Sequence, residues 1–243
     1  LNHAKINSVL FGLENNNPNF SLAYSYYKAI REANLDIKLI PVKREGQGLN
    51  SGDVSEQVHL SATAIRNNIN DEKIEKYLSK EMLADLRKEN IASEAELFPY
   101  LKYKILTLGK VGIEKIYDVS EGLENRIYEA VLKAENYNDL VNLIATKRYS
   151  NKKIQRVLLH ILTNTTKENY KKYFSTNNFR VLAVKKDKAA IIREINRNGK
   201  INLHPLLNSK NSMNFEQDIK VARIYELLFS KKDIFRENIQ IID

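Results

Sequence analysis

A cluster of basic residues just past the middle of the chain has the composition of a phosphate-binding surface. Residues 146–162, TKRYSNKKIQRVLLHIL, carry five cations and one tyrosine between positions 147 and 156: Lys147, Arg148, Tyr149, Lys152, Lys153 and Arg156. Lysine and arginine side chains bind phosphate oxygens, and such contacts position a protein on a polyanion. The spacing therefore indicates phosphate contacts rather than acid–base or nucleophilic chemistry.

The same segment predicts the helix that would hold these cations at the surface. Apolar residues recur at i, i+3, i+4, i+7 and i+8, the spacing of one helical face: Ile154, Val157, Leu158, Ile161 and Leu162. Ser150 is the expected N-cap, because its hydroxyl can accept a hydrogen bond from an unpaired N–H of the first turn. With the apolar face packed on a core, the cations at the start of the helix would lie on a rigid support.

The net charge of the chain is concentrated in the same region. The sequence has 39 basic and 30 acidic residues, a net charge of +9. Residues 146–200 contain 15 basic and 3 acidic residues, so this quarter carries +12 and the rest sums to −3. A local excess of this kind is the electrostatic footprint expected for nucleic acid. A solvated lysine-rich surface is the alternative.

Composition limits the other classes of function. The 243 residues are 43% hydrophobic, enough for a packed core, and contain no cysteine, which excludes disulfides and thiol chemistry. No apolar run is long enough to span a bilayer and no signal peptide is visible, so we expect a cytoplasmic protein without a membrane partner. The four histidines are far apart, and no metal site is predicted.

Because the chain begins with Leu1 and mid-domain sequence, we expect it to be part of a longer protein.

A second group of residues has the arrangement of a nucleotide site. A predicted strand at 36–42 is followed by three glycines within 46–52, and the segment SATAIR then opens a helix. Ser61 and Thr63 lie at the start of that helix, where unpaired N–H groups favour anions, and Arg66 lies one turn on. This resembles the phosphate end of an α/β nucleotide site. A flexible glycine-rich connection is the alternative.

Periodicity predicts three parts for the chain: an α/β part over 1–70, a helical part over 71–175, and a small α/β module over 176–243. The expected strands are 7–13, 36–42, 179–184, 200–205 and an edge strand within 234–242. The expected helices begin near Leu22, Ser61, Ser93, Ser120, Asn138, Ser150, Asp187 and Phe215. The helix from Ser93 should end at Gly109 and Gly112, and Asn138 should cap the helix that follows Ala134.

Several separated motifs, in preserved order, resemble the bacterial tRNA(Met) cytidine acetate ligases. They are Pro18-Asn19 with Leu22 and YYKAI, Lys43-Arg44 with Gly46 and Gly48, SATAIR, FPYLKYKIL at 98–106, EGLENR at 121–126, TKRY…IQRVLLHIL and FRVLAV at 179–184. The resemblance covers most of the chain. It implies a fold class of α/β plus α: a remnant of a Rossmann-like nucleotidyltransferase sheet, a helical tRNA-binding domain and a small C-terminal α/β module.

The resemblance also implies a reaction. Proteins of this family activate acetate with ATP as acetyl-adenylate and then acetylate N4 of the wobble cytidine of elongator tRNA(Met). ATP is a substrate, accompanied by Mg²⁺, and no tightly bound cofactor is expected.

Carried over residue by residue, the family pattern assigns ATP contacts to Gly12, Asn19 and Arg44. Ser61, Thr63 and Arg66 of SATAIR join them on the phosphate side, and the six residues of the basic cluster are the expected tRNA contacts.

Two departures from the family pattern affect catalysis. The HxGH segment, whose histidines would stabilise charge on the ATP phosphates, is absent from this sequence, so no catalytic residue is assigned. The connection between FGLE and Pro18-Asn19 is also shorter than the family pattern. Two alternatives therefore stay open: a non-catalytic RNA-binding module with a vestigial nucleotide site, and an adenylyltransferase for a small molecule.

Overall fold

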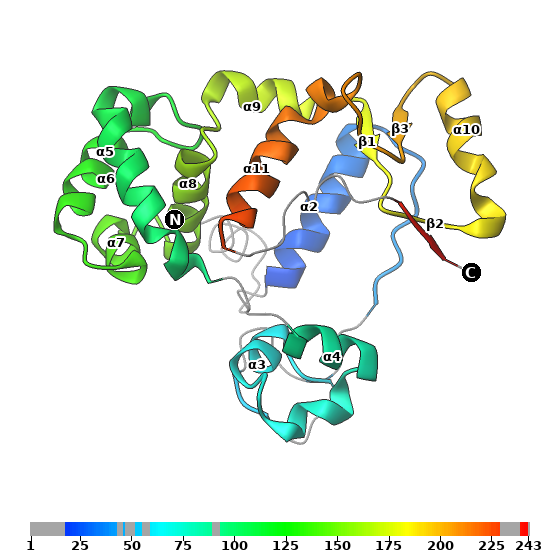
Figure 1. Cartoon of the computed structure of the whole chain (residues 1–243), viewed down its shortest axis with the longest axis horizontal. Helices are drawn as coiled ribbons and strands as arrows, with labels where there is room; N and C mark the ends of the chain where they lie inside the picture. Colours follow the sequence, from blue (N-terminus) through cyan, green and yellow to red (C-terminus); the bar gives the residue numbers. More distant parts are fainter. Residues whose placement is uncertain are drawn as a thin grey trace. The chain divides into compact units, whose positions relative to one another are not determined.

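The chain divides into two units, residues 1–91 and 92–243, each described by itself. The structure is a computed structural model, and it describes residues 18–42, 46, 52–54, 59–88, 93–228 and 239–242. Most of the described residues are helical, and two small parallel sheets lie in the second unit (Figure 1).

The N-terminal unit contains short helices. They are α2 (Pro18–Glu32), α3 (Ala62–Asn67), the 3₁₀ helix η1 (Glu72–Tyr77) and α4 (Lys80–Lys88). Proline is favoured at the first position of a helix, because its missing N–H would have no helical partner there, and Pro18 begins α2. Ser61 and Asp71 cap α3 and η1 through their side-chain oxygens.

The predicted strand at 36–42 is not a strand among the described residues. Residues 35–42 have no regular secondary structure. A strand needs a neighbour that exchanges backbone hydrogen bonds, and the part of the chain that the structure describes supplies none here. The apolar side chains of this segment are consequently exposed, from 44% for Leu39 to 89% for Val42. The other strand predicted for this unit, 7–13, lies outside the described residues.

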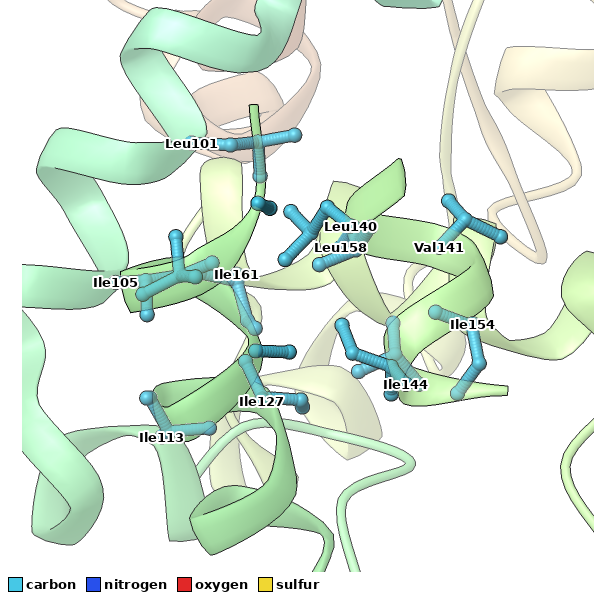
Figure 2. Close-up of a cluster of buried hydrophobic side chains, with 14 of the residues drawn as sticks. Leu101, Ile105, Ile113, Ile127, Leu140, Val141, Ile144, Ile154, Leu158 and Ile161 are labelled. Atoms are coloured by element: carbon cyan, nitrogen blue, oxygen red, sulfur yellow. The ribbon is translucent and has the colours of Figure 1, made fainter. Parts of the chain in front are cut away.

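The C-terminal unit is built on a bundle of helices. They are η2 (Glu94–Leu97), α5 (Phe98–Glu114), α6 (Leu123–Lys133), α7 (Tyr137–Ile144), α8 (Asn151–Leu162) and α9 (Lys167–Phe174). Helix α5 packs against α6 and α8, and α7 packs against both α6 and α8. Figure 2 shows the apolar side chains that converge between them, and the fully buried ones include Leu101, Ile105, Ile127, Leu140 and Ile154.

Several predicted helix boundaries differ in detail from those of the structure. Ser93 caps η2, and α5 begins only at Phe98. Gly109, at φ 60° and ψ 177°, has a non-helical backbone, so the first helical stretch of α5 ends there as predicted. A second stretch continues past Gly112 to Glu114. Helix α7 is capped by Asn136, whose side chain accepts from the N–H of Asp139 at 2.9 Å, and not by Asn138. In each case the periodicity located the helix, whereas the hydrogen bonds at its ends decided the first and last residue.

The last part of the second unit combines helices with strands that are shorter than predicted. Strand β1 (Asn178–Arg180) pairs in parallel with β3 (Asn202–His204), and β2 (Ala183–Lys185) pairs in parallel with β4 (Gln240–Ile242). The helical elements are η3 (Lys186–Lys188), α10 (Ala190–Arg197), η4 (Ser212–Phe215) and α11 (Glu216–Glu226).

The segment predicted as one strand at 179–184 is split between two sheets. Val181 N–H donates to the oxygen of His204 at 3.0 Å, whereas the oxygen of Leu182 accepts from Gln240 N–H at 3.0 Å. The backbone therefore changes hydrogen-bonding partner between these two residues. A continuous apolar run does not reveal such a change.

Candidate nucleic-acid interface and nucleotide site

The basic cluster begins in a turn that Thr146 holds closed. The hydroxyl of Thr146 accepts from the N–H groups of Arg148 and Tyr149 at 3.2 and 3.0 Å. Its own N–H donates to the oxygen of Tyr149 at 2.9 Å. Such a side-chain turn fixes the backbone just before a helix. Thr146 was not predicted from the sequence, although a threonine two and three residues before these N–H groups is the local signal for this turn.

Helix α8 then carries the cluster as the sequence predicted. The side chain of Ser150 accepts from Lys153 N–H at 3.4 Å, so the predicted cap is confirmed. The predicted apolar face is also confirmed, because Ile154, Val157, Leu158 and Ile161 are all fully buried. Leu162, at the end of that face, is only partly buried. The cations are therefore attached to a helix anchored on its opposite face in the core.

The ring of Tyr149 contacts one cation of the turn and one cation of the helix. Lys153 Nζ lies 5.3 Å from the ring centroid, and the guanidinium carbon of Arg148 lies 5.6 Å from it. At these distances the electron-rich ring attracts a cation. The Tyr149 hydroxyl is buried and has no hydrogen-bond partner among the described residues. The ring thus orients Arg148 and Lys153.

Most of the cluster is accessible to a ligand. Lys147, Arg148, Lys152 and Arg156 are exposed or half-exposed, and Lys153 is half-buried. Arg148 forms an ion pair with Glu121, and both side chains are more than half exposed, so the pair is open to solvent. Among the described residues, no ion pair is formed by the other four cations. Lys152 and Arg156 lie four residues apart and therefore share one face of α8.

His160 lies one turn beyond Arg156 and is packed between aromatic rings. Its ring meets Tyr117 edge-on at 5.4 Å and Tyr170 at 6.4 Å, and the two tyrosines stack on each other at 3.5 Å. Burial lowers the pKa of His160 below its usual value; the Asp118 carboxylate opposes this change and Arg156 reinforces it. These contacts pack the His160 ring against the stacked tyrosines.

The residues predicted to contact ATP phosphates lie on two helices of the N-terminal unit. Ser61 is buried, and its hydroxyl caps α3 by accepting from Ala64 N–H at 2.9 Å. Thr63 is half-buried and Arg66 is exposed on the same helix. Asn19 is exposed on α2. Gly12 and Arg44 lie outside the described residues. The structure therefore brings Ser61, Thr63 and Arg66 together, and the role of each residue in binding stays a prediction.

The glycine loop that precedes α3 approaches it closely. The amide of Asn68, just after α3, donates to the oxygen of Gly52 at 3.0 Å. Gly46 has φ +85°, and a Cβ atom there would lie 2.6 Å from the main-chain oxygen of His59. Only glycine allows this approach without strain. Gly46 and Gly52 therefore lie against the residues that flank α3.

The described residues contain no group of three or more histidine, aspartate or glutamate side chains placed to hold a metal ion. No helix in the described part of the chain is both long and apolar enough to cross a membrane.

A family model for the HIGH Nucleotidyl Transferase family matches residues 2–239. The chain belongs to this family. The family match and the similar proteins below confirm the resemblance seen in the sequence.

Two of the similar curated proteins are both named tRNA(Met) cytidine acetate ligase. One, from Clostridium perfringens (strain SM101 / Type A), is 33% identical over 219 residues, which are 88% of this chain and 54% of that protein. The other, from Thermoanaerobacter sp. (strain X514), is 30% identical over 226 residues, which are 88% of this chain and 56% of that protein. This HIGH nucleotidyl transferase chain therefore spans about half the length of the curated relatives it matches.

Solved structures show the same fold. The apo crystal structure of Thermotoga maritima TmcAL matches with a TM-score of 0.72 at 19% identity, over 85% of this chain and 54% of that one. The Thermotoga maritima TmcAL structure bound with alpha-thio ATP matches with a TM-score of 0.71 at 18% identity, over 94% of this chain and 60% of that one. At these identities the likeness shows the fold alone.

Proposed function

We propose that this chain supplies the RNA-binding surface and part of the ATP site of an ATP-dependent tRNA(Met) cytidine acetate ligase. The observation that carries the proposal is the basic cluster on α8, whose side chains are accessible while the opposite face of the helix is buried. A rigid, positively charged helix of this kind suits contacts to the phosphate backbone of RNA. The names of the curated relatives support the same partner.

The proposed reaction has two steps. An oxygen of acetate attacks the α-phosphorus of ATP, the bond from that phosphorus to the bridging oxygen breaks, and pyrophosphate leaves. The exocyclic N4 of the wobble cytidine of elongator tRNA(Met) then attacks the acetyl carbon. AMP leaves with the bonding electron pair, and N4 loses a proton.

Each named residue has a part in this proposal. Gly12, Asn19 and Arg44 contact ATP, and Thr63 and Arg66 lie on the phosphate side of α3. Ser61 fixes the start of α3 through its capping hydrogen bond. Mg²⁺ would accompany the phosphates, and the described residues contain no cluster of three ligands for it. Lys147, Arg148, Lys152, Lys153 and Arg156 contact tRNA phosphates, and Tyr149 orients two of them.

Two variants test the proposal by separating its two ligands. The double reversal Lys152→Glu/Lys153→Glu should weaken binding of a tRNA(Met) transcript strongly at low salt and less at high salt. The log–log salt slope should fall by about 0.7 to 0.9 for each phosphate that the protein no longer binds. Arg44→Ala should weaken ATP binding and leave tRNA affinity nearly unchanged. The matched control Lys104→Glu/Lys133→Glu reverses two lysines on α5 and α6, outside the cluster, and should affect tRNA binding little.

The outcome also decides between the alternatives. Unchanged tRNA affinity in Lys152→Glu/Lys153→Glu contradicts the proposed surface and supports a solvated lysine-rich face. Binding of tRNA without ATP supports an RNA-binding module with a vestigial nucleotide site. Binding of ATP without tRNA supports a small-molecule adenylyltransferase.

A further inference from the structure

The C-terminal unit also has a concave surface, formed by residues that follow the basic cluster in the chain. It is a cavity of about 980 Å³ lined by the end of α9, by β1 and by the start of α11. A cavity of this size is in the range that holds a nucleotide-sized ligand. Helix α9 joins it to the basic region, since α9 follows α8 and its Lys172 lines the cavity.

The base of the cavity is held by a hydrogen-bonded network. The side-chain oxygen of Asn178 lies 2.9 Å from His204 Nε2 and accepts from the Asn214 amide at 3.3 Å. His204 Nδ1 lies 3.3 Å from the amide nitrogen of Asn211, and its ring packs edge-on against the buried Phe215 at 5.3 Å. Asn178 is a cavity-lining residue, but its carbonyl oxygen is thus already engaged. The network holds β1 and the loop that precedes α11 in place without a ligand.

Other lining residues present groups suited to a nucleobase. Phe179 lines the cavity and is 46% exposed, so its ring is accessible to a ligand. The side chain of Asn177, two residues before Phe179, is exposed and also lines the cavity. The Asn177 oxygen accepts from Asn202 N–H at 2.8 Å, which fixes its backbone. An aromatic face stacks on any base, and an amide offers both donor and acceptor groups to its hydrogen-bonding edge.

The charges around the cavity favour a base with its flanking phosphate over a phosphate alone. Lys172 and Arg180 supply positive charge. Glu216 and Asp218 lie on the α11 side, where their carboxylates raise the pKa of the lining residue Tyr173, after the larger effect of its burial. Carboxylates repel phosphate, but they accept hydrogen bonds from exocyclic amino groups of bases.

We propose that this cavity binds an unpaired nucleotide of the RNA whose backbone lies on α8. The base stacks on Phe179, its edge contacts the amide of Asn177, and the adjoining phosphate meets Lys172. The inference rests on the proposed function and deepens it, because it adds a site for single-stranded RNA to a surface that contacts only backbone phosphates.

The test compares two synthetic RNAs: a stem-loop with an unpaired loop of about seven nucleotides, and a blunt duplex of the same stem. Phe179→Leu in the full chain should lower affinity for the stem-loop by about 5- to 100-fold, the range for removal of one stacking partner. It should leave affinity for the duplex unchanged. The salt slope should also stay as in wild type, because the same number of phosphates is bound. Phe179→Trp should restore stem-loop affinity.

Two further variants separate loss of the site from loss of structure. Asn177→Ala removes an exposed amide and should lower stem-loop affinity about 2- to 10-fold, as expected for one hydrogen bond. Tyr103→Leu removes an aromatic ring that is 71% exposed on α5, away from the cavity lining, and should change neither affinity.

Stem-loop affinity that is unchanged in both Phe179→Leu and Asn177→Ala overturns the inference and leaves the proposed function standing. An equal decrease in affinity for stem-loop and duplex also overturns it, because the ring would then contribute to RNA binding in general and not to binding of an unpaired base. A wild-type chain that binds neither RNA overturns the proposed function, and the inference with it.

Discussion

The Nε atom of Arg126 donates a hydrogen bond of 2.7 Å to the main-chain oxygen of Ile144, the last residue of α7. A terminal nitrogen of the same guanidinium donates to the main-chain oxygens of Leu143 and Ala145 at 2.8 and 3.3 Å. The last carbonyls of a helix have no partner within it and carry partial negative charge, so a cation there is stabilising. Arg126 therefore fixes the end of α7 directly before the turn that begins the basic cluster.

Replacing Arg126 by Ala should lower the free energy of unfolding by about 1 to 3 kcal/mol, because the variant cannot form the charge-assisted hydrogen bonds to three carbonyls. Urea titrations followed by circular dichroism measure the change. Arg193→Ala is the matched control, since Arg193 is exposed on α10 and no hydrogen bond from its side chain is found among the described residues. Equal stability of the two variants would contradict the capping role.

Two substitutions at Tyr149 separate its ring from its hydroxyl. Tyr149→Phe keeps the ring and removes a buried hydroxyl without a partner in the described structure, so stability should stay equal or rise by up to about 1 kcal/mol. Tyr149→Leu removes the ring that orients Arg148 and Lys153, so tRNA affinity should fall about 3- to 10-fold. Fluorescence anisotropy with labelled tRNA measures the affinity of both variants. Similar decreases in the two would show that the hydroxyl, and not the ring, matters.

His160 should make stability depend on pH in the acidic range. Burial holds its pKa in the folded protein below the ordinary 6.5, so the unfolded chain binds more protons than the folded one as pH falls below that value. The free energy of unfolding should therefore decrease as pH is lowered from about 6.5, and should be insensitive to this group above it. Urea titrations at about pH 7.5 and pH 5.5, on either side of the ordinary histidine pKa, measure the decrease.

His160→Gln provides the comparison, because the other titrating groups are common to both proteins. The variant should lose less stability than wild type between the two pH values, whatever its stability at the higher pH. The same pH dependence in both proteins would show that His160 does not contribute.

Gly46→Ala should destabilise the N-terminal unit more than a left-handed backbone alone explains. The new Cβ would meet the His59 oxygen at 2.6 Å in addition to the strain of φ +85°. Gly199→Ala is the control, since Gly199 has φ +67° but no heavy atom within 4 Å of the added Cβ. We expect a decrease in stability of about 1 to 2 kcal/mol for the control and more for Gly46→Ala. Faster hydrogen exchange of the α3 amides in Gly46→Ala, and not in Gly199→Ala, would locate the effect.

Sequence alone determined the features that depend on neighbours within a few turns. The apolar stripe of α8 and its Ser150 cap follow from residues close together in the chain, and both are present as predicted. The charge excess of residues 146–200 is likewise a property of composition. The family motifs were also found in the sequence, because their residues and their order can be read without any knowledge of contacts.

Tertiary structure decided what depends on pairing between distant residues. Arg126 reaches the carbonyl of Ile144 across 18 positions, and Glu121 pairs with Arg148 across a longer interval, so neither partner follows from local pattern. The run at 179–184 looked like one strand, yet its two halves pair with His204 and Gln240 of different segments. Residues 36–42 have the composition of a strand but no pairing partner in the described structure. Helical hydrogen bonds close within four residues and can be inferred locally, whereas strand pairing and long side-chain contacts exist only once the chain has folded.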